Sequence, residues 1–279
     1  MKKDKKLPLT IVVLVLVVSN VFSQQNKNDS LFAFREFSRL QKMYQHLPVQ
    51  INLHIQNSAS PLTTPQDTLQ TEMSIYFGTA GFYMEAEGLE EIVNDSLIVM
   101  VNNPSKQISV YRNDKSVMKR IYESLSMVLP DSSLQEFTHR YQSLVQDLDG
   151  AIRKIALNSR VTLYGTGKPK EIMTVTYQKT SYKPIEVTQT KLRLLPIDSS
   201  IYAGLLNDKT YDDKLLSAAT SKGQIFFLVK EQKTSYRFLR IDYNVQIPPA
   251  KQQDRIAVAE DGSYLPSKGY EDYQVSTEF

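Results

Sequence analysis

The amino-acid sequence predicts an α+β fold whose sheet is antiparallel. Apolar residues recur at three- and four-residue spacing from 31 to 47, which predicts an amphipathic helix capped by Asp29-Ser30 and ended by Pro48. From 49 to 56 apolar residues instead alternate with polar ones, so a half-buried strand begins there. Short turns then separate a run of short strands, which is typical of an antiparallel meander.

The meander is expected to continue to residue 112, with strands at 73–77, 81–85, 91–94, 97–101 and 107–112. The strand at 97–101 has five apolar residues in a row (LIVMV). A strand with one solvated face alternates apolar and polar residues, so a covering layer is expected on both sides of this one.

A helical insertion is predicted at about 115–157, with its second helix starting after Pro130. Strands are then expected at 160–164, 171–178, 183–195, 224–230 and 236–246, with a short helix near 212–219 and a last strand pair around Asp261-Gly262. The hexapeptide QKTSYK at 178–183 returns as QKTSYR at 232–237. We interpret both copies as the same hairpin turn.

The first 23 residues have the pattern of a secretory signal peptide. Four lysines precede an apolar run at 9–18, and we expect cleavage after Ser23. A bilayer-spanning helix needs about twenty apolar residues, so a retained membrane anchor is the weaker alternative. The chain has no cysteine, which leaves no site for a lipid anchor or a disulfide. The sequence thus predicts a periplasmic or secreted protein, with residues 24–279 forming one domain and no stable membrane anchor after cleavage.

The charge of the mature chain is balanced. The 33 basic and 30 acidic side chains of the sequence include four lysines and one aspartate of the leader, so 29 of each remain. Nucleic-acid binding requires a basic surface that neutralises phosphates. We therefore expect no nucleic-acid partner.

Local motifs do not indicate a reaction. Ser116 and Lys119 have the S-x-x-K spacing of serine β-lactamases, but no S-D-N motif follows. The acidic tract at 147–150 lacks the outer ligands of a calcium loop, and the glycines at 165 and 167 lack the rest of a phosphate loop. No two histidines stand at metal-ligand spacing, although a metal site could still assemble in three dimensions. The sequence thus predicts no catalytic residue, no metal and no cofactor, and the chain is expected not to be an enzyme.

The C-terminal alternation from Tyr273 to Phe279 also occurs in outer-membrane barrels. Such a barrel requires alternating strands nearly throughout, whereas the helical segments above interrupt them. An ordinary last strand is the favoured interpretation.

The order of elements is similar to that of the periplasmic lipoprotein carriers and receptors, the LolA/LolB superfamily. The most specific likeness covers residues 72–112, where Phe82-Tyr83-Met84, Ile92-Val93, Asn94-Asp95 and the strands at 97–101 and 108–111 resemble the family's strand pairs and turn. Ser96 follows Asp95 where a glycine is usual in the family, the next strand is aliphatic where an aromatic is expected, and the insertion is long.

This resemblance implies an unclosed, half-barrel-like curved sheet with helices packed on its concave face. It also implies a protein that binds or carries a hydrophobic ligand, such as lipid or lipoprotein acyl chains, without catalysis. The residues expected to contact the ligand are apolar and lie on several strands: Leu53, Ile75, Phe77, Phe82, Met84, Ile98, Met100, Ile108 and Val110. The alternative is a cell-envelope scaffold whose apolar face docks a protein partner and holds no small ligand.

Overall fold

The computed structural model describes residues 27–41, 46–79, 81–113, 133–161, 170–221, 223–243, 245 and 248–278. The side chains of 27–29, 41 and 133 are not among those described. The predicted signal peptide, the first part of the predicted insertion (115–132), the Ser116/Lys119 pair, most of the strand predicted at 160–164 and the glycines at 165 and 167 lie outside the described residues.

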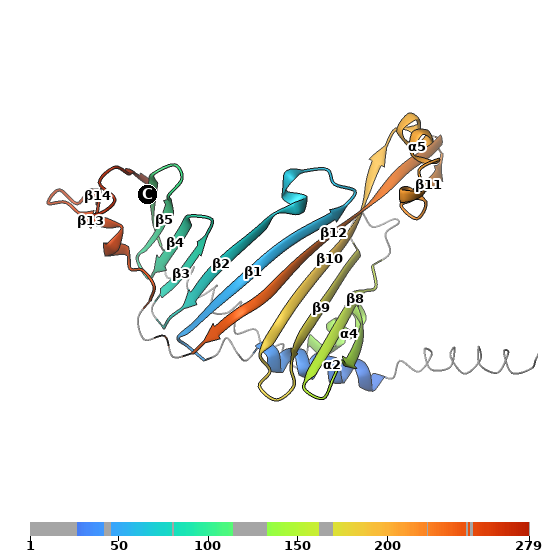
Figure 1. Cartoon of the computed structure of the whole chain (residues 1–279), viewed down its shortest axis with the longest axis horizontal. Coiled ribbons are helices and arrows are strands. Elements are labelled where there is room, and N and C mark those ends of the chain that lie inside the picture. Colours follow the sequence, from blue (N-terminus) through green and yellow to red (C-terminus); the bar gives the residue numbers. More distant parts are fainter. Residues whose placement is uncertain are drawn as a thin grey trace, which may run out of the picture.

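One large sheet dominates the structure (Figure 1). Its strands follow the order β15-β6-β5-β4-β3-β2-β1-β12-β10-β9-β8-β7, and β11 adds to β12. The strand bounds are β1 Val49–Ser60, β2 Gln70–Phe77, β3 Gly81–Ala86, β4 Leu89–Asn94, β5 Leu97–Asn102, β6 Gln107–Arg112, β7 Tyr141–Asp147, β8 Ile152–Ser159, β9 Lys170–Gln178, β10 Pro184–Ile197, β11 Leu215–Thr220, β12 Gly223–Asp242 and β15 Gln274–Glu278. A separate hairpin joins β13 (Ile256–Val258) to β14 (Tyr264–Pro266).

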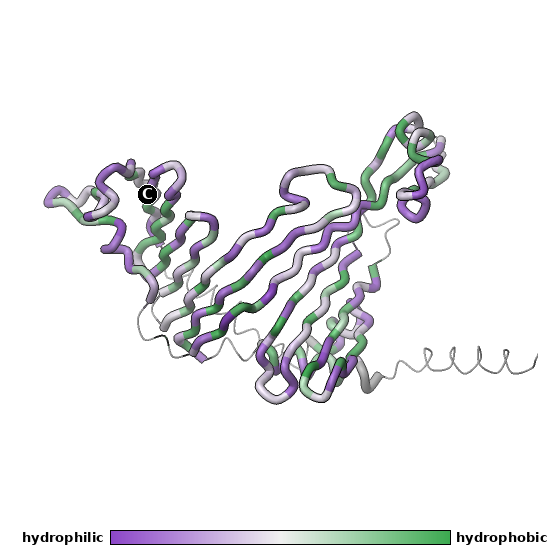
Figure 2. Tube along the Cα trace, viewed as in Figure 1, coloured by the Kyte–Doolittle hydropathy of each residue, from purple (hydrophilic) through white to green (hydrophobic). Residues whose placement is uncertain are grey.

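The predicted α+β class with an unclosed antiparallel sheet is confirmed. The strand order ends at β15 and β7, which do not pair with each other. Neighbouring strands are antiparallel, except that β15 pairs in parallel with β6. The meander β2–β6 was predicted within a few residues, and Figure 2 shows apolar and polar residues alternating along the long central strands.

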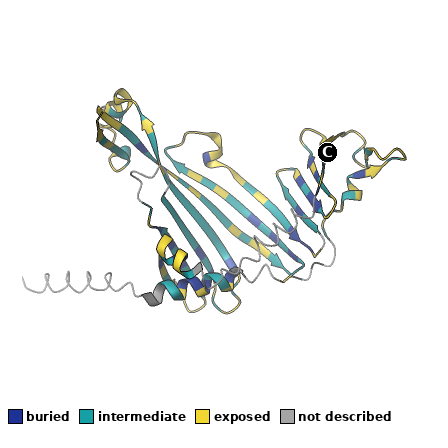
Figure 3. Ribbon diagram, turned by 180° about the vertical axis from the view of Figure 1, so that it is seen from behind, coloured by how far each residue is buried: buried dark blue, intermediate teal, exposed yellow. Residues whose placement is uncertain are grey.

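The described helices are α2 (Lys27–Gln41), α4 (Ser133–Arg140) and α5 (Ser199–Leu205). Figure 3, seen from behind, shows α2 and α4 in front of the sheet at its β7–β9 end. There Phe34, Leu40 and Phe137 pack with Ile155 and Tyr177 of the sheet, all of them less than a tenth exposed. The helix α2 already includes Asp29 and Ser30, so these residues are not its cap as predicted.

The predicted helix at 130–157 is wrong beyond Arg140. The helix α4 ends there, and the chain continues directly into the hairpin of β7 and β8. In β7 Ser143 is buried and Val145 half-buried between exposed neighbours, so Tyr141 and Val145 of the predicted helical stripe also fit a two-residue period, whereas Leu144 is exposed. The carboxylate of Asp149 accepts hydrogen bonds from the amides of Ala151 and Ile152, both at 2.7 Å, and shapes the turn.

Two further assignments are wrong in the second half of the chain. The predicted helix near 212–219 is strand β11, and the helical turns lie earlier, at α5 and at the 3₁₀ turn Lys209–Tyr211. The two strands predicted at 224–230 and 236–246 form one strand of 20 residues, β12. Its repeat copy at 232–237 stays extended because β1 and β10 pair with it on either side, whereas the copy at 178–183 forms the β9–β10 turn.

Candidate ligand-binding face

The two faces of the sheet can be followed from strand to strand, because residues directly opposite each other point to the same face. Ile155 packs under α2. One row of directly opposite residues runs from it across the sheet: Ile155, Val175, Val187, Tyr236 and Ile55 of β1. We call this side the helix face. The other side of β2–β6 is covered by Val245 and by residues between 248 and 275, and we call it the C-terminal face.

The structure brings seven of the nine predicted ligand residues onto the helix face. The register aligns Ile75, Met84 and Met100 in one row, and Phe77, Phe82 and Ile98 in the next. Leu53 lies beside them on β1, on the same face as Ile51. We call these seven residues the helix-face patch: Leu53, Ile75, Phe77, Phe82, Met84, Ile98 and Met100.

The other two predicted residues, Ile108 and Val110, lie on the C-terminal face and are 0% exposed. They belong to the core under the C-terminal segment and cannot share a surface with the patch. The error arose because both faces of β5 are apolar, so the sequence alone does not say which of them lies on the same side as Ile108 and Val110 of β6.

The residues of the helix-face patch differ in their exposure to solvent. Leu53 and Phe77 are buried, and the Phe77 and Phe82 rings are 5.3 Å apart. Ile75, Phe82, Met84 and Ile98 are half-buried, and Met100 is 46% exposed. A methionine this exposed beside other apolar side chains leaves apolar area in contact with solvent.

Glu91 was not expected at this site. It stands directly opposite Met84 on one side and Met100 on the other, so its carboxyl group lies within the apolar row. Burial raises the pKa of Glu91 above its ordinary value. A signal was present in the sequence, because Glu91 breaks the apolar alternation of its strand, but the partner strands were needed to place it.

The same face is filled by the protein itself at the α2 end. Glu36 of α2 is 1% exposed and faces the sheet. Its carboxylate accepts hydrogen bonds from Arg153 (2.9 Å), Tyr177 (2.5 Å), Tyr182 (3.1 Å) and Arg39 (2.9 Å). Burial raises the pKa of Glu36, but the bonds from Tyr177, Arg153 and Tyr182 outweigh this, so it lies below the ordinary value. The carboxylate is therefore satisfied, and it anchors α2 without free binding capacity.

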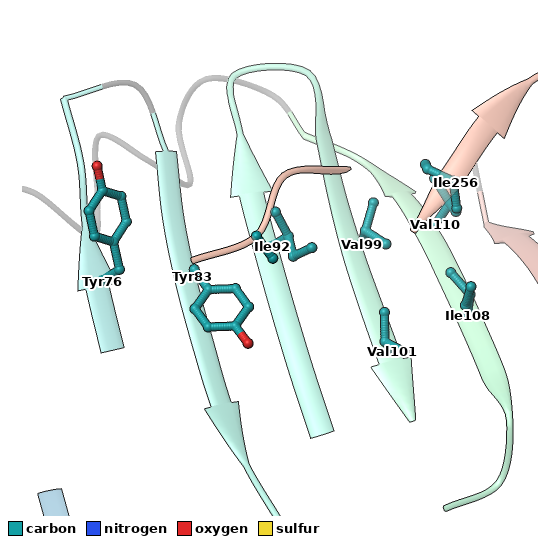
Figure 4. Close-up of a cluster of buried hydrophobic side chains, with 9 residues drawn as sticks. Tyr76, Tyr83, Ile92, Val99, Val101, Ile108, Val110 and Ile256 are labelled. Atoms are coloured by element: carbon teal, nitrogen blue, oxygen red, sulfur yellow. The ribbon is translucent and has the colours of Figure 1, made fainter. Parts of the chain in front are cut away.

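The C-terminal segment explains why β5 is apolar on both faces. Val99 and Val101 are buried in one cluster with Ile256 (Figure 4) and Ala250. Met100, between them in the strand, faces the opposite way. Two interactions fix the C-terminal segment: Arg255 donates to Glu90 at 2.8 Å, and Tyr273 donates to Asn103 at 2.8 Å. One covering layer is thus the protein's own chain.

The acidic tract pairs with basic side chains. Asp147 binds Arg153 at 2.6 Å and Lys179 at 3.2 Å, and these hydrogen bonds lower its pKa to about 2. Within the described ranges no three His, Cys, Asp or Glu residues gather in a metal-binding group. In the same part of the chain, no helix is long and apolar enough to cross a membrane.

Comparison with known proteins gives matches among solved structures. No family model and no curated protein matches the chain. Similar structures include a LolA superfamily protein, NE2245 from Nitrosomonas europaea, at 8% identity and TM-score 0.27 over 81% of this chain and 96% of that one. A DUF1329 family protein from Desulfovibrio piger matches at 8% identity and TM-score 0.31, over 79% of this chain and 95% of that one.

A chain of the Pseudomonas aeruginosa MucA/MucB complex matches at 10% identity and TM-score 0.29. The match covers 79% of this chain and 59% of that chain. The LolA likeness expected from the sequence is thus found again among solved structures. At these TM-scores the fold assignment rests on the strand order and register described above.

Proposed function

We propose that this protein is an exported, non-catalytic binder or carrier of a hydrophobic ligand, such as lipid or lipoprotein acyl chains. The observation that carries the proposal is the helix-face patch. Six of its residues lie in two adjacent rows across β2–β5, and the outermost, Met100, is 46% exposed. The row of Phe77, Phe82 and Ile98 is completed by Val93 of β4 and is apolar throughout, which suits a ligand that offers no hydrogen bonds.

The flexible side chains at the accessible edge support the proposal. Met84 and Met100 are unbranched and can repack around chains of different length. The mixed character of their row also fits an amphiphile, because the carboxyl group of Glu91 offers a polar partner beside the apolar side chains of Met84 and Met100. No metal or cofactor enters this account.

A pair of substitutions tests this use of the patch. Replacing Met84 and Met100 together by glutamine keeps the side-chain length and removes the apolar surface. Burial of a methionine side chain contributes about 1.5–3 kcal/mol, so binding of a fluorescent fatty acid should weaken at least about tenfold. Val258→Gln is the matched control, because Val258 is 67% exposed on the β13–β14 hairpin, which packs on the opposite face of the sheet. Equal weakening by the control, or none by the double variant, would overturn the proposal.

The alternative, an envelope scaffold for a protein partner, is favoured by a different surface. At the far end from the C-terminal segment, α5 and the β11–β12 hairpin project from the sheet (Figure 1). This tip exposes Ile201 (50%), Leu206 (53%) and Ile225 (42%). Substituting all three by serine should abolish crosslinking to an envelope protein if the scaffold function operates, and leave fatty-acid binding unchanged.

A further inference from the structure

We infer that a cleft at the strand ends of β2–β4, on the C-terminal side, is a binding site for a small amphipathic carboxylate. The cleft has a volume of about 470 Å³ and lies between the β2–β3 turn and residues 248–253. This size is within the range of pockets that hold small molecules. Ile108 and Val110 lie deeper on the same face, and the helix-face patch contributes only Phe82, so the inference does not rest on the proposed function.

The body of such a ligand would meet apolar surface. Tyr76, Phe82, Ile92 and Val93 line the cleft from the sheet, and Pro248 and Ala250 line it from the C-terminal segment. Tyr76 and Ile92 are also buried members of the core beneath that segment, so this wall is rigid.

The Tyr76 hydroxyl is an unused donor in this cleft. Tyr76 is 6% exposed, and its hydroxyl has no hydrogen-bond partner among the described residues. The Tyr83 hydroxyl, in contrast, reaches Glu90, and Figure 4 shows the two hydroxyls pointing in opposite directions along the sheet. A Cβ atom at Gly78 would lie 2.9 Å from the Tyr76 hydroxyl oxygen. The Tyr76 side chain therefore occupies space that is free because residue 78 is a glycine. The Tyr76 hydroxyl oxygen is not one of the fully buried polar atoms without a partner, so it stays accessible, and a ligand or water in the cleft can accept its hydrogen bond.

The charge of the cleft selects an acid over a base. Lys251 is the only ionised side chain among its described lining residues, and it is exposed at the opening. The opposite wall is held in place because Asn94 donates to Gln252 at 2.7 Å, and Gln252 donates to the carbonyl of Leu97 at 3.0 Å. A carboxylate could thus accept from Tyr76 and pair with Lys251 without a rearrangement of the wall.

Phenylbutyrate is a suitable probe, with phenylbutyramide as its neutral counterpart. We expect the protein to bind phenylbutyrate and to bind the amide at least about fivefold more weakly, as the loss of an exposed ion pair predicts. Tyr76→Phe should weaken phenylbutyrate binding about tenfold, because a hydrogen bond to a charged group is lost. Lys251→Gln should weaken it about fivefold. The matched controls Tyr211→Phe and Lys268→Gln lie elsewhere and should have no effect.

Isothermal titration calorimetry measures the affinities, and methyl NMR locates the ligand. The Ile92 methyl resonance should shift on binding, whereas the Met100 methyl on the helix face should not. Both the phenylalanine and the glutamine variants keep the side-chain shape, and unchanged melting temperatures would show that they fold. Absence of binding, equal affinity for acid and amide, or unaffected binding by Tyr76→Phe and Lys251→Gln would each overturn the inference. None of these results depends on Met84 or Met100, so the proposed function stands or fails separately.

Discussion

Glu36→Gln should destabilise the attachment of α2 to the sheet. The substitution keeps the size of the side chain and removes the charge that four donors share. Breaking a buried ion pair by removing one partner costs about 3–5 kcal/mol. Arg153 retains Asp147 at 2.6 Å, which favours the low end of that range. Glutamine keeps one acceptor oxygen, so one donor pair, Tyr177 with Arg153 or Tyr182 with Arg39, would meet an amide NH2 group instead, at about 1–3 kcal/mol. Since this loss is part of the same cost, we expect a total of about 3 kcal/mol.

Urea unfolding followed by circular dichroism measures this cost. With a slope of about 3 kcal/mol per molar urea, the midpoint should fall by about 1 M. A double-mutant cycle with Tyr177→Phe separates the contributions. That substitution should cost about 1.5–3 kcal/mol in the wild-type background and less when Glu36→Gln is already present, because the acceptor is then no longer charged. If Glu36→Gln changes stability by less than about 0.5 kcal/mol, as an exposed substitution would, the reasoning is wrong.

Two other substitutions test contacts just beyond the two ends of β2. Lys230→Met leaves Asp67 buried without the cation that now lies 2.7 Å away, so the melting temperature at pH 7 should fall by at least about 5 °C. The hydrogen bond from Lys230 lowers the pKa of Asp67, so the stability that this pair contributes is present above pH 3.8, the ordinary value, and lost as the pH falls below it. The difference between wild type and variant, measured by thermal unfolding from pH 7 to 3, should therefore shrink; a constant difference would contradict the assignment. Gly78→Ala places a Cβ atom 2.8 Å from the Tyr76 ring, so it should cost about 1–3 kcal/mol in the same assay, and Gly150→Ala, with nothing within 4 Å, is its control. Equal effects of the two alanines would refute the proposed crowding.

The sequence predicted the first half of the sheet because each strand there is short, alternating and bounded by turn residues. The strands β2–β6 and the period change at Val49 are local patterns that tertiary contacts did not override. The strand β12 could not be found as one element, because its extended middle depends on pairing with β1 and β10, which are far away in sequence. The helix predicted through 141–157 failed because Tyr141 and Val145, four residues apart, fit either period, whereas Leu144 lies on the opposite face of β7 and is 49% exposed.

The candidate site was predictable in composition and only partly in position. Seven apolar residues were placed on one face by strand alternation, and the register confirms that they share it. Ile108 and Val110 fell on the other face because the covering layer comes from the C-terminal segment, far away in the chain. Glu91 and the hydroxyl of Tyr76 were missed for a similar reason. Their place in a site depends on neighbours from other strands and from the C-terminal segment.

The most direct test of the central claim is the mass of the protein purified from its native envelope under non-denaturing conditions, before and after extraction with organic solvent. The account predicts a stoichiometric extra mass that extraction removes and that identifies the class of lipid. The double variant with glutamine in place of Met84 and Met100 should be purified without this extra mass. A wild-type protein that carries no extra mass before extraction would contradict the claim that the helix-face patch holds a hydrophobic ligand.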